Sequence, residues 1–232
     1  MATVLVPTSS APATATATPG AMTRLQLVQR VFLEAGLAGS GPSSTVDQVG
    51  EAEQLVGYVD EAWLNIQQAR KWRWMWELVT LTLESGEQTI TDEVPADRYL
   101  TDTAFIDTAP LTYLEWDVWR STHPSITNTG TPCDWTVRPD NTLQFSSIAS
   151  DDTTITVERF ANPTVMTADD DTPAGLKGEH HMLIVWEAVL LYAGFDEASN
   201  LYAHAKAQRK RKLMAVTNAE GALNMRMGGP LA

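Results

Sequence analysis

Apolar residues near the start of the chain recur at the three- and four-residue spacing of an amphipathic helix. This spacing predicts a first helix over residues 23–37, with Thr23 as its N-cap. It predicts a second helix over residues 44–70, in which Thr45 and Gln48 have the spacing of a capping box. The apolar face of this second helix carries Val49, Ala52, Val56, Val59, Trp63 and Ile66.

The period changes to two in residues 71–83. There, three tryptophans and then three aliphatic residues stand at every second position. A period of two is typical of a strand with one packed face, so we predict a strand across this segment. After a serine–glycine turn, Gln88–Ile90 is expected to pair back on that strand.

Short β-like pieces continue through residues 91–160, with a turn at Pro139–Asn141. Several short strands at close spacing are typical of a small antiparallel sandwich or barrel. The pieces predicted as strands are residues 105–106, 111–114, 134–137, 142–146 and 153–160, and residues 115–120 are predicted as a brief helix.

The helical period returns in the last quarter of the chain. A helix marked by Leu183 and Trp186 is expected to be interrupted near Gly194, and another is predicted over residues 196–219. The predicted fold class is α+β, a helical bundle of two N-terminal and two C-terminal helices with the β module inserted between them. The apolar side of the last helix carries Ala198, Leu201, Ala205, Leu213 and Val216.

Composition and periodicity together divide the chain into five ranges. Residues 1–21 are rich in Ala, Thr and Pro and carry no charge, so we expect an extended arm that a neighbouring subunit holds in place. We expect residues 22–70 and 176–220 to form the helical core and residues 71–175 to form the β module. The Gly- and Met-rich residues 221–232 are expected to be a docking tail.

The length of 232 residues and a hydrophobic fraction of 44% allow a real core in about one domain. No apolar run approaches the roughly 20 residues of a membrane span. The first residues lack the basic start and apolar region of a secretory signal, so we expect a chain that is soluble and intracellular at synthesis, with no membrane partner. With one cysteine, Cys133, neither an internal disulfide nor a thiolate-only metal site is expected.

The net charge of −13 is unevenly distributed along the chain. Residues 1–205 carry 28 acidic and 10 basic side chains, whereas residues 206–232 carry 1 and 6. An acidic body argues against nucleic-acid binding by its surface, because phosphate contacts need Lys and Arg. The basic C-terminal end indicates a second contact surface of opposite sign.

The candidate chemistry is sparse. His180 and His181 form the one histidine pair, and the aspartates at 169–171 precede it. Adjacent histidines at a helix start point in different directions, and we interpret the aspartate run as solvated, so no metal site is expected. No nucleophile elbow, phosphate loop, zincin helix or dinucleotide motif occurs, and we therefore predict no enzyme, catalytic residue or cofactor.

Eight tryptophans are many for a chain of this length. Trp72, Trp74 and Trp76 could stack on bases or sugars, but such platforms usually lie in basic grooves, and only Lys71 and Arg73 lie near. Packing in the core or between subunits is the favoured interpretation. The candidates for this packing are Trp63, Trp72, Trp74, Trp76 and Trp186.

The basic run Arg209–Lys212, with Lys206 one turn earlier, has three interpretations. It could contact nucleic acid, it could dock onto an acidic protein surface, or its cations could simply favour the C-terminal half of a solvated helix. The sequence leaves all three open, and protein docking is favoured.

The order of short motifs resembles the head–tail adaptor, or connector, family of tailed bacteriophages, which includes the tail tubular proteins of short-tailed phages. The resemblance covers roughly residues 22–220. The motifs are ARKWRW at 69–74, VPADRY at 94–99, GTPCDW at 130–135, ITVERF at 155–160 leading to Asn162-Pro163, and DTP at 171–173 entering the aliphatic helix HMLIVWEA at 181–188.

The resemblance implies a structural virion protein at the neck. It implies a homo-oligomeric ring, dodecameric in such proteins, beneath the portal. Helices would build the ring, the β module would face the downstream tail or nozzle protein, and genomic DNA would only pass through the lumen. The C-terminal end would dock on the portal, and the candidates for this contact are Lys206, Arg209, Lys210, Arg211, Lys212, Leu223, Met225, Arg226 and Met227.

Two other functions compete with this interpretation. One is a different neck or tail component, such as a stopper or tail-completion protein. The other is a partner- or carbohydrate-binding β module carried on helices, which would need exposed tryptophans in a cleft.

Overall fold

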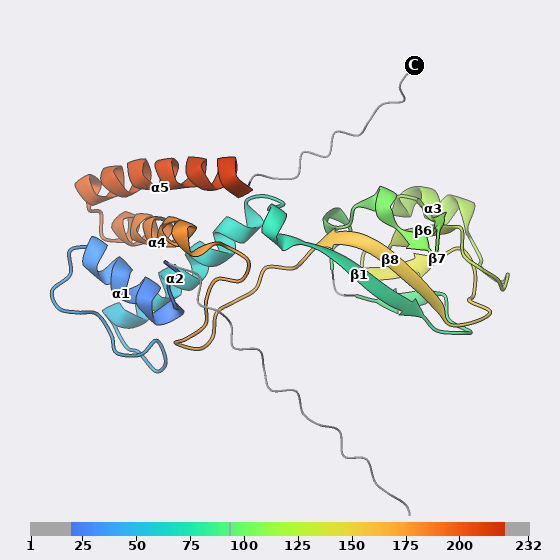
Figure 1. Ribbon diagram of the computed structural model, residues 1–232, viewed down its shortest axis with the longest axis horizontal. Helices are drawn as coiled ribbons and strands as arrows, with labels where there is room; N and C mark the ends of the chain where they lie inside the picture. The colour runs from blue at the N-terminus through green and yellow to red at the C-terminus, as the bar shows by residue number, and fades with distance from the viewer. Residues whose placement is uncertain (1–19, 93, 221–232) are drawn as a thin grey trace, which may run out of the picture.

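The computed structural model describes residues 20–92 and 94–220 of the chain (Figure 1). The fold is mixed α+β. One part is made of long helices, and the other contains two sheets of four strands each within the described residues. Two long strands, β1 at Trp76–Leu83 and β8 at Thr153–Phe160, lie side by side and lead from the helical part into the β part (Figure 1).

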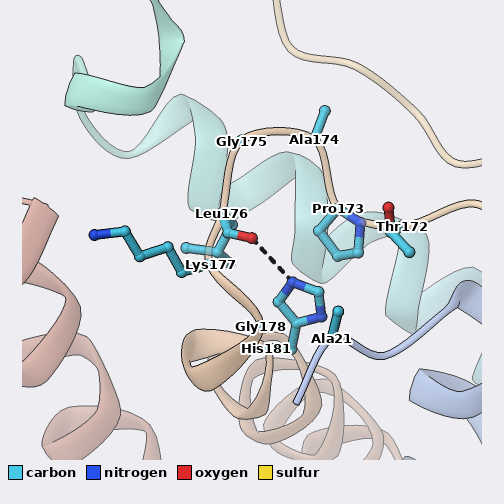
Figure 2. Close-up of a pocket in the computed structure, with 9 residues that line it drawn as sticks. All are labelled: Ala21, Thr172, Pro173, Ala174, Gly175, Leu176, Lys177, Gly178 and His181. Atoms are coloured by element: carbon cyan, nitrogen blue, oxygen red, sulfur yellow. Dashed lines mark hydrogen bonds between the residues drawn. The ribbon is translucent and has the colours of Figure 1, made fainter. Parts of the chain in front are cut away.

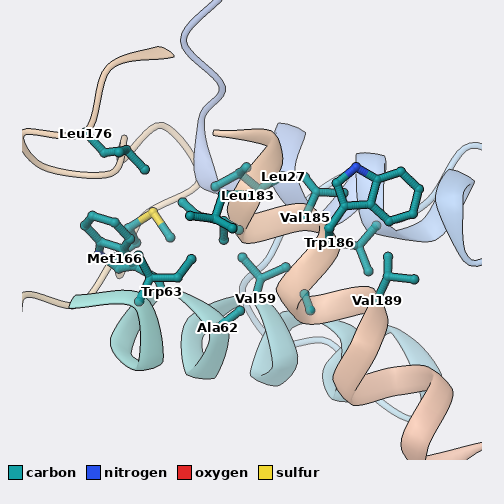
Figure 3. Close-up of a cluster of buried hydrophobic side chains, with 14 of the residues drawn as sticks. Leu27, Val59, Ala62, Trp63, Met166, Leu176, Leu183, Val185, Trp186 and Val189 are labelled. Atoms are coloured by element: carbon teal, nitrogen blue, oxygen red, sulfur yellow. The ribbon is translucent and has the colours of Figure 1, made fainter. Parts of the chain in front are cut away.

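The helical part is built around α4, Met182–Phe195. This helix lies between α5, Ser199–Glu220, on one side and α1, Arg24–Glu34, with α2, Glu51–Gln68, on the other (Figure 1). All three neighbours pack on α4, which explains why it is aliphatic around most of its circumference. Figure 3 shows side chains of α2 and α4 meeting in this core, with Trp63 beside Met166.

The capping prediction for the first helix is confirmed. Thr23 accepts a hydrogen bond from the backbone of Gln26, and the Gln26 side chain accepts one from the backbone of Thr23. Together these bonds satisfy two amides that the first turn leaves open.

The predicted start of the second helix is wrong. The helix begins at Glu51 with Gly50 as N-cap, whose φ of 65° suits glycine. Thr45 makes no capping box, because its backbone N–H and hydroxyl both donate to the Asp169 carboxylate, at 2.6 and 2.5 Å. A contact with a distant loop therefore outcompetes the local cap.

The period-two segment is a strand only in its second half. Residues Arg73–Met75 form a 3-10 turn, and β1 covers Trp76–Leu83. Trp72 turns back into the helical core, where its Nε1 donates to the Ile66 carbonyl at 2.5 Å. Its ring stacks on Trp74 with centroids 4.5 Å apart. The spacing of Trp72 and Trp74 thus reflects packing on the helical core and not a pleated face, whereas Trp76 is the first residue of β1.

The first sheet has the order β1-β8-β3-β4. The predicted strand at 153–160 is confirmed as β8, Thr153–Phe160, and it pairs antiparallel with β1 along its whole length, from Trp76 opposite Phe160 to Leu83 opposite Thr153. The shorter members are β3, Phe105–Ile106, and β4, Ala109–Pro110.

The second sheet has the order β2-β7-β6-β5 and corrects two predictions. The strand β2, Thr89–Thr91, pairs with β7, Thr142–Phe145, and not with β1. The strand β5, Thr112–Tyr113, runs parallel to β6, Asp134–Val137, so the module is not purely antiparallel. No closed barrel forms in the described residues, because the two sheets have separate edges.

The inner faces of the two sheets share one hydrophobic core. Leu83 and Ile155 from the first sheet and Trp135 and Phe145 from the second are all buried in it. The predicted brief helix is confirmed as α3, Trp116–Thr122, which places Trp119 against the ring of His123. The module therefore packs as a two-sheet sandwich. Short 3-10 turns lie at Ala96–Arg98, Thr101–Thr103 and Gly178–His180.

Candidate interaction surfaces

The basic run lies in the middle of α5 and faces two directions. Lys206, Lys210 and Arg211 are exposed, and Lys212 is half-buried. Arg209 points the other way, toward α4, where its Nε donates to the Glu187 carboxylate. The run is therefore not one continuous cationic patch.

The Glu187–Arg209 pair belongs to the packing of α4 against α5. The Glu187 side chain is only 10% exposed. A carboxylate with so little water around it needs a partner, and Arg209 supplies one. Arg209, one of the docking candidates, thus pairs with a residue of its own chain, although its side chain is 37% exposed. The remaining docking candidates Leu223, Met225, Arg226 and Met227 lie outside the described residues.

The five tryptophans that were candidates for packing lie in different surroundings. Trp63 and Trp72 are fully buried and Trp186 is nearly so, while Trp74 is half-buried. Trp76 is 40% exposed on the outer face of β1, and its Nε1 donates to Glu158 at 2.9 Å. Because Trp72 and Trp74 stack on each other, the segment presents no row of open rings for bases.

His181 fastens the start of the fold to the loop before α4. Its Nδ1 accepts the backbone N–H of Met22 at 2.9 Å, and its Nε2 lies 3.0 Å from the Leu176 carbonyl (Figure 2). Since Nδ1 accepts, Nε2 carries the proton of a neutral ring. Burial lowers the pKa of His181, although both hydrogen bonds act in the opposite direction. Both ring nitrogens are therefore occupied.

A cavity of about 270 Å³ lies beside this histidine, lined by residues 172–178 together with Ala21 and His181 (Figure 2). Its polar side chains are those of Thr172 and Lys177 besides the histidine. Within residues 20–92 and 94–220, no three His, Cys, Asp or Glu side chains gather as metal ligands. The cavity brings no nucleophile and base together.

The aspartate run also has a structural role, because two of its three members, Asp169 and Asp171, are half-buried and accept hydrogen bonds. Asp169 accepts from Thr45, and these hydrogen bonds lower the pKa of Asp169. Asp171 accepts the backbone N–H groups of Thr167 and Ala168, at 2.6 and 2.8 Å. The backbone carbonyls of the same two aspartates accept the first amides of α1.

Two partly buried ionic clusters link residues that are far apart in the sequence. Arg24, at the start of α1, donates to both carboxylate oxygens of Asp60 on α2, at 3.0 and 2.6 Å. In the β part, Arg159 pairs with Glu77 at 2.7 Å and with Asp92. The partners are 36, 82 and 67 positions apart, so no local pattern could have paired them.

No helix in the described part of the chain has both the length and the apolar character that crossing a membrane requires.

One family of known proteins matches most of the chain. Residues 22–230 match the family described as SU10 adaptor protein. The match starts at the residue where the motif-based resemblance starts and extends ten residues beyond its expected end at residue 220. No curated protein matches the chain. The order of motifs and the family match agree, and the chain belongs to the SU10 adaptor protein family of phage adaptors.

Proposed function

We propose that this protein forms a ring beneath the portal and joins the phage head to the tail. The observation that carries the proposal is the match of residues 22–230 to an adaptor family. Membership of that family points to a structural role in the virion rather than to an enzyme. The ring is proposed to be dodecameric and to be assembled in the host cytoplasm.

The charge of the body suits a channel through which DNA passes. Non-specific affinity for DNA depends on neutralising phosphates with Lys and Arg. Residues 1–205 carry 28 acidic and only 10 basic side chains. Several of the bases are already paired with acids, including Arg24, Arg120 and Arg159. An acidic wall would repel the DNA and let it slide, while the β part contacts the downstream tail or nozzle protein.

The C-terminal end is proposed as the portal-docking element. Its apolar and basic side chains, Leu223, Met225, Arg226 and Met227, would enter clefts between portal subunits. The cations that remain open on α5, namely Lys206, Lys210, Arg211 and Lys212, are proposed as a second surface for an acidic protein.

Electron microscopy of the purified protein mixed with its cognate portal tests the proposal. The expected result is a ring stacked coaxially on the portal. A chain that binds the tail end of the neck but not the portal would instead indicate a stopper or tail-completion protein. A chain that binds neither would overturn the adaptor function.

Truncation tests the docking role of the tail. The chain should end after Glu220, because this buried residue pairs with Lys177 and its removal would disturb the fold. Loss of portal binding in a pull-down is expected. A control with residues 221–232 in scrambled order keeps the composition, so it separates a specific contact from charge alone. Portal binding that survives truncation would remove the tail from the docking surface.

A further inference from the structure

The outer face of α5 has no partner within the described chain. Of the 22 residues in this helix, those that are buried are Ala205, Val216 and Glu220. The exposed surface of α5 carries one row of side chains four residues apart, which begins beside Gly194 of α4 and continues along the helix. This row, the basic row, consists of Tyr202, Lys206, Lys210 and Met214.

The basic row combines two lysines with two larger, less polar side chains. Tyr202 is 40% and Met214 58% exposed, and they flank the two lysines. Tyr and Met are enriched in protein interfaces relative to other surfaces. The neighbouring row on the same helix carries alanines at positions 203, 207 and 215, with the exposed Arg211 between them.

A complementary row lies on α2. Glu53, Gly57 and Glu61 are exposed and stand four residues apart, so they form one row, the acidic row. Neither glutamate forms an ion pair within the described residues. A Cβ added at Gly57 would meet nothing within 4 Å. Glycine inside a helix is destabilising relative to alanine, and the packing of this chain gives no reason for it here.

The basic row and the acidic row of the same protomer cannot contact each other. Both α2 and α5 pack against α4, which lies between them (Figure 1), and the side chains of both rows are exposed to solvent. A second copy of the protein can place its acidic row against the basic row of the first copy. A contact between two different faces is heterologous, and repetition of such a contact generates a ring when the rotation closes.

We propose that the basic row of one protomer docks on the acidic row of the next protomer in the ring. Lys206 and Lys210 are about 6 Å apart along the helix, and Glu53 and Glu61 about 12 Å. Both ammonium groups therefore fit between the carboxylates, above Gly57, where the helices can approach most closely. The proposal rests on the ring assembly proposed above.

Charge exchange tests the contact. Lys206→Glu with Lys210→Glu, and separately Glu53→Lys with Glu61→Lys, should each lower ring assembly on the cognate portal at least about tenfold, because like charges across an interface oppose association. A chain that carries all four changes should recover assembly. The matched control is Glu84→Lys with Glu87→Lys, which changes the net charge equally on exposed acids of the β part and should assemble normally.

Cross-linking tests the same contact by distance. In a Cys133→Ser background, chains with Lys210→Cys are mixed with chains that carry Glu61→Cys, and a short bismaleimide is added after assembly. Cross-linked dimers are expected from the mixture and not from either chain alone. This second measurement does not depend on how well the charge variants fold.

The outcomes separate the two proposals. If the wild-type protein forms no ring on the portal, the proposed adaptor ring is wrong, and so is the proposed contact between the two rows. If the wild-type ring forms and the charge-reversed chains assemble equally well, only the contact is overturned. If reversal of the lysines abolishes portal binding and reversal of the glutamates does not restore it, the basic row binds the portal and the inference is wrong.

Discussion

Met22 and His181 are 159 positions apart in the chain and are joined by a hydrogen bond from the backbone N–H of Met22 to the Nδ1 of His181. The second ring nitrogen contacts the Leu176 carbonyl. One neutral imidazole therefore holds Met22, two residues before the start of α1, and the loop before α4 in the same place. Protonation of Nδ1 would turn this acceptor into a donor that faces the backbone N–H of Met22, and the hydrogen bond between Met22 and His181 would be lost.

The stability of the protein should fall as the pH is lowered below about 6.5. Burial lowers the pKa of His181 from its ordinary value of 6.5, so the unfolded chain takes up a proton at a higher pH than the folded chain. Below 6.5 the unfolded state binds more protons, and the free energy of unfolding declines until the folded pKa is also passed. Urea unfolding measured from pH 7.5 to 5 follows this loss.

Replacing His181 with asparagine isolates the contribution of this group. The Asn oxygen can accept the Met22 N–H but does not titrate in this range, so the variant should show a flatter dependence on pH than the wild type. The matched control is His123→Asn, in the β part. Equal pH slopes for wild type and His181→Asn would show that another group carries the effect.

Arg24→Ala should destabilise the protein by about 2–4 kcal/mol, because it leaves a partly buried Asp60 without its cation. It also removes hydrogen bonds to the Thr45 hydroxyl and the Thr167 carbonyl. Arg30→Ala is the control, since its more exposed pair with Glu34, four residues on, is worth about 0.5 kcal/mol. Chemical denaturation compares the two, and equal losses would contradict the structural role of Arg24.

Trp72→Ala and Trp76→Ala should differ strongly although the two residues are close in sequence. Trp72 is fully buried, and its truncation should cost about 3–5 kcal/mol in unfolding free energy. Trp76 is 40% exposed, so we expect a loss of about 1 kcal/mol or less. A larger loss of ring assembly than of stability in Trp76→Ala would place this side chain at a subunit contact.

Arg209→Glu should destabilise the monomer, whereas Lys210→Glu should not. The first change sets two carboxylates together beside α4, because Glu187 is the partner of Arg209. We expect a cost of about 1–3 kcal/mol, the usual cost of leaving a buried polar group without its partner. Thermal unfolding of the two single variants measures the difference. Similar melting temperatures would mean that the pair contributes little to packing.

Gly57→Ala should raise the unfolding free energy of the monomer by about 1 kcal/mol, because alanine favours the helix and the added methyl meets no other atom. Gly57→Trp should leave the monomer folded, as followed by circular dichroism, and should block ring assembly by bulk. A tryptophan variant that assembles normally would place α2 away from any subunit contact.

Local periodicity predicted those elements whose conformation is determined by residues nearby in the sequence. The cap on Thr23, the strands β6 and β8, and the long helices α4 and α5 follow from spacing that each segment carries by itself. The order of short motifs indicated the adaptor family for the same reason, because it depends on succession along the chain and not on contacts.

Long-range contacts decided the rest. Thr45 had the signature of a helix cap, yet Asp169 binds it from 124 positions away. The tryptophans at 72 and 74 had the period of a strand. However, the Trp72 ring is buried in the helical core, and the Trp74 ring stacks on it. The direction of β5 and the partner of β2 depend on which strand lies alongside, which no segment encodes alone.

The candidate surfaces divide in the same way. The sequence by itself determined that cations gather near residues 206–212 and that the body is acidic, since charge is a property of each residue. Only the tertiary structure decided that Arg209 turns inward to Glu187 while Lys206 and Lys210 remain open. The physical reason is that α4 buries a carboxylate, which requires a cation from the helix packed upon it.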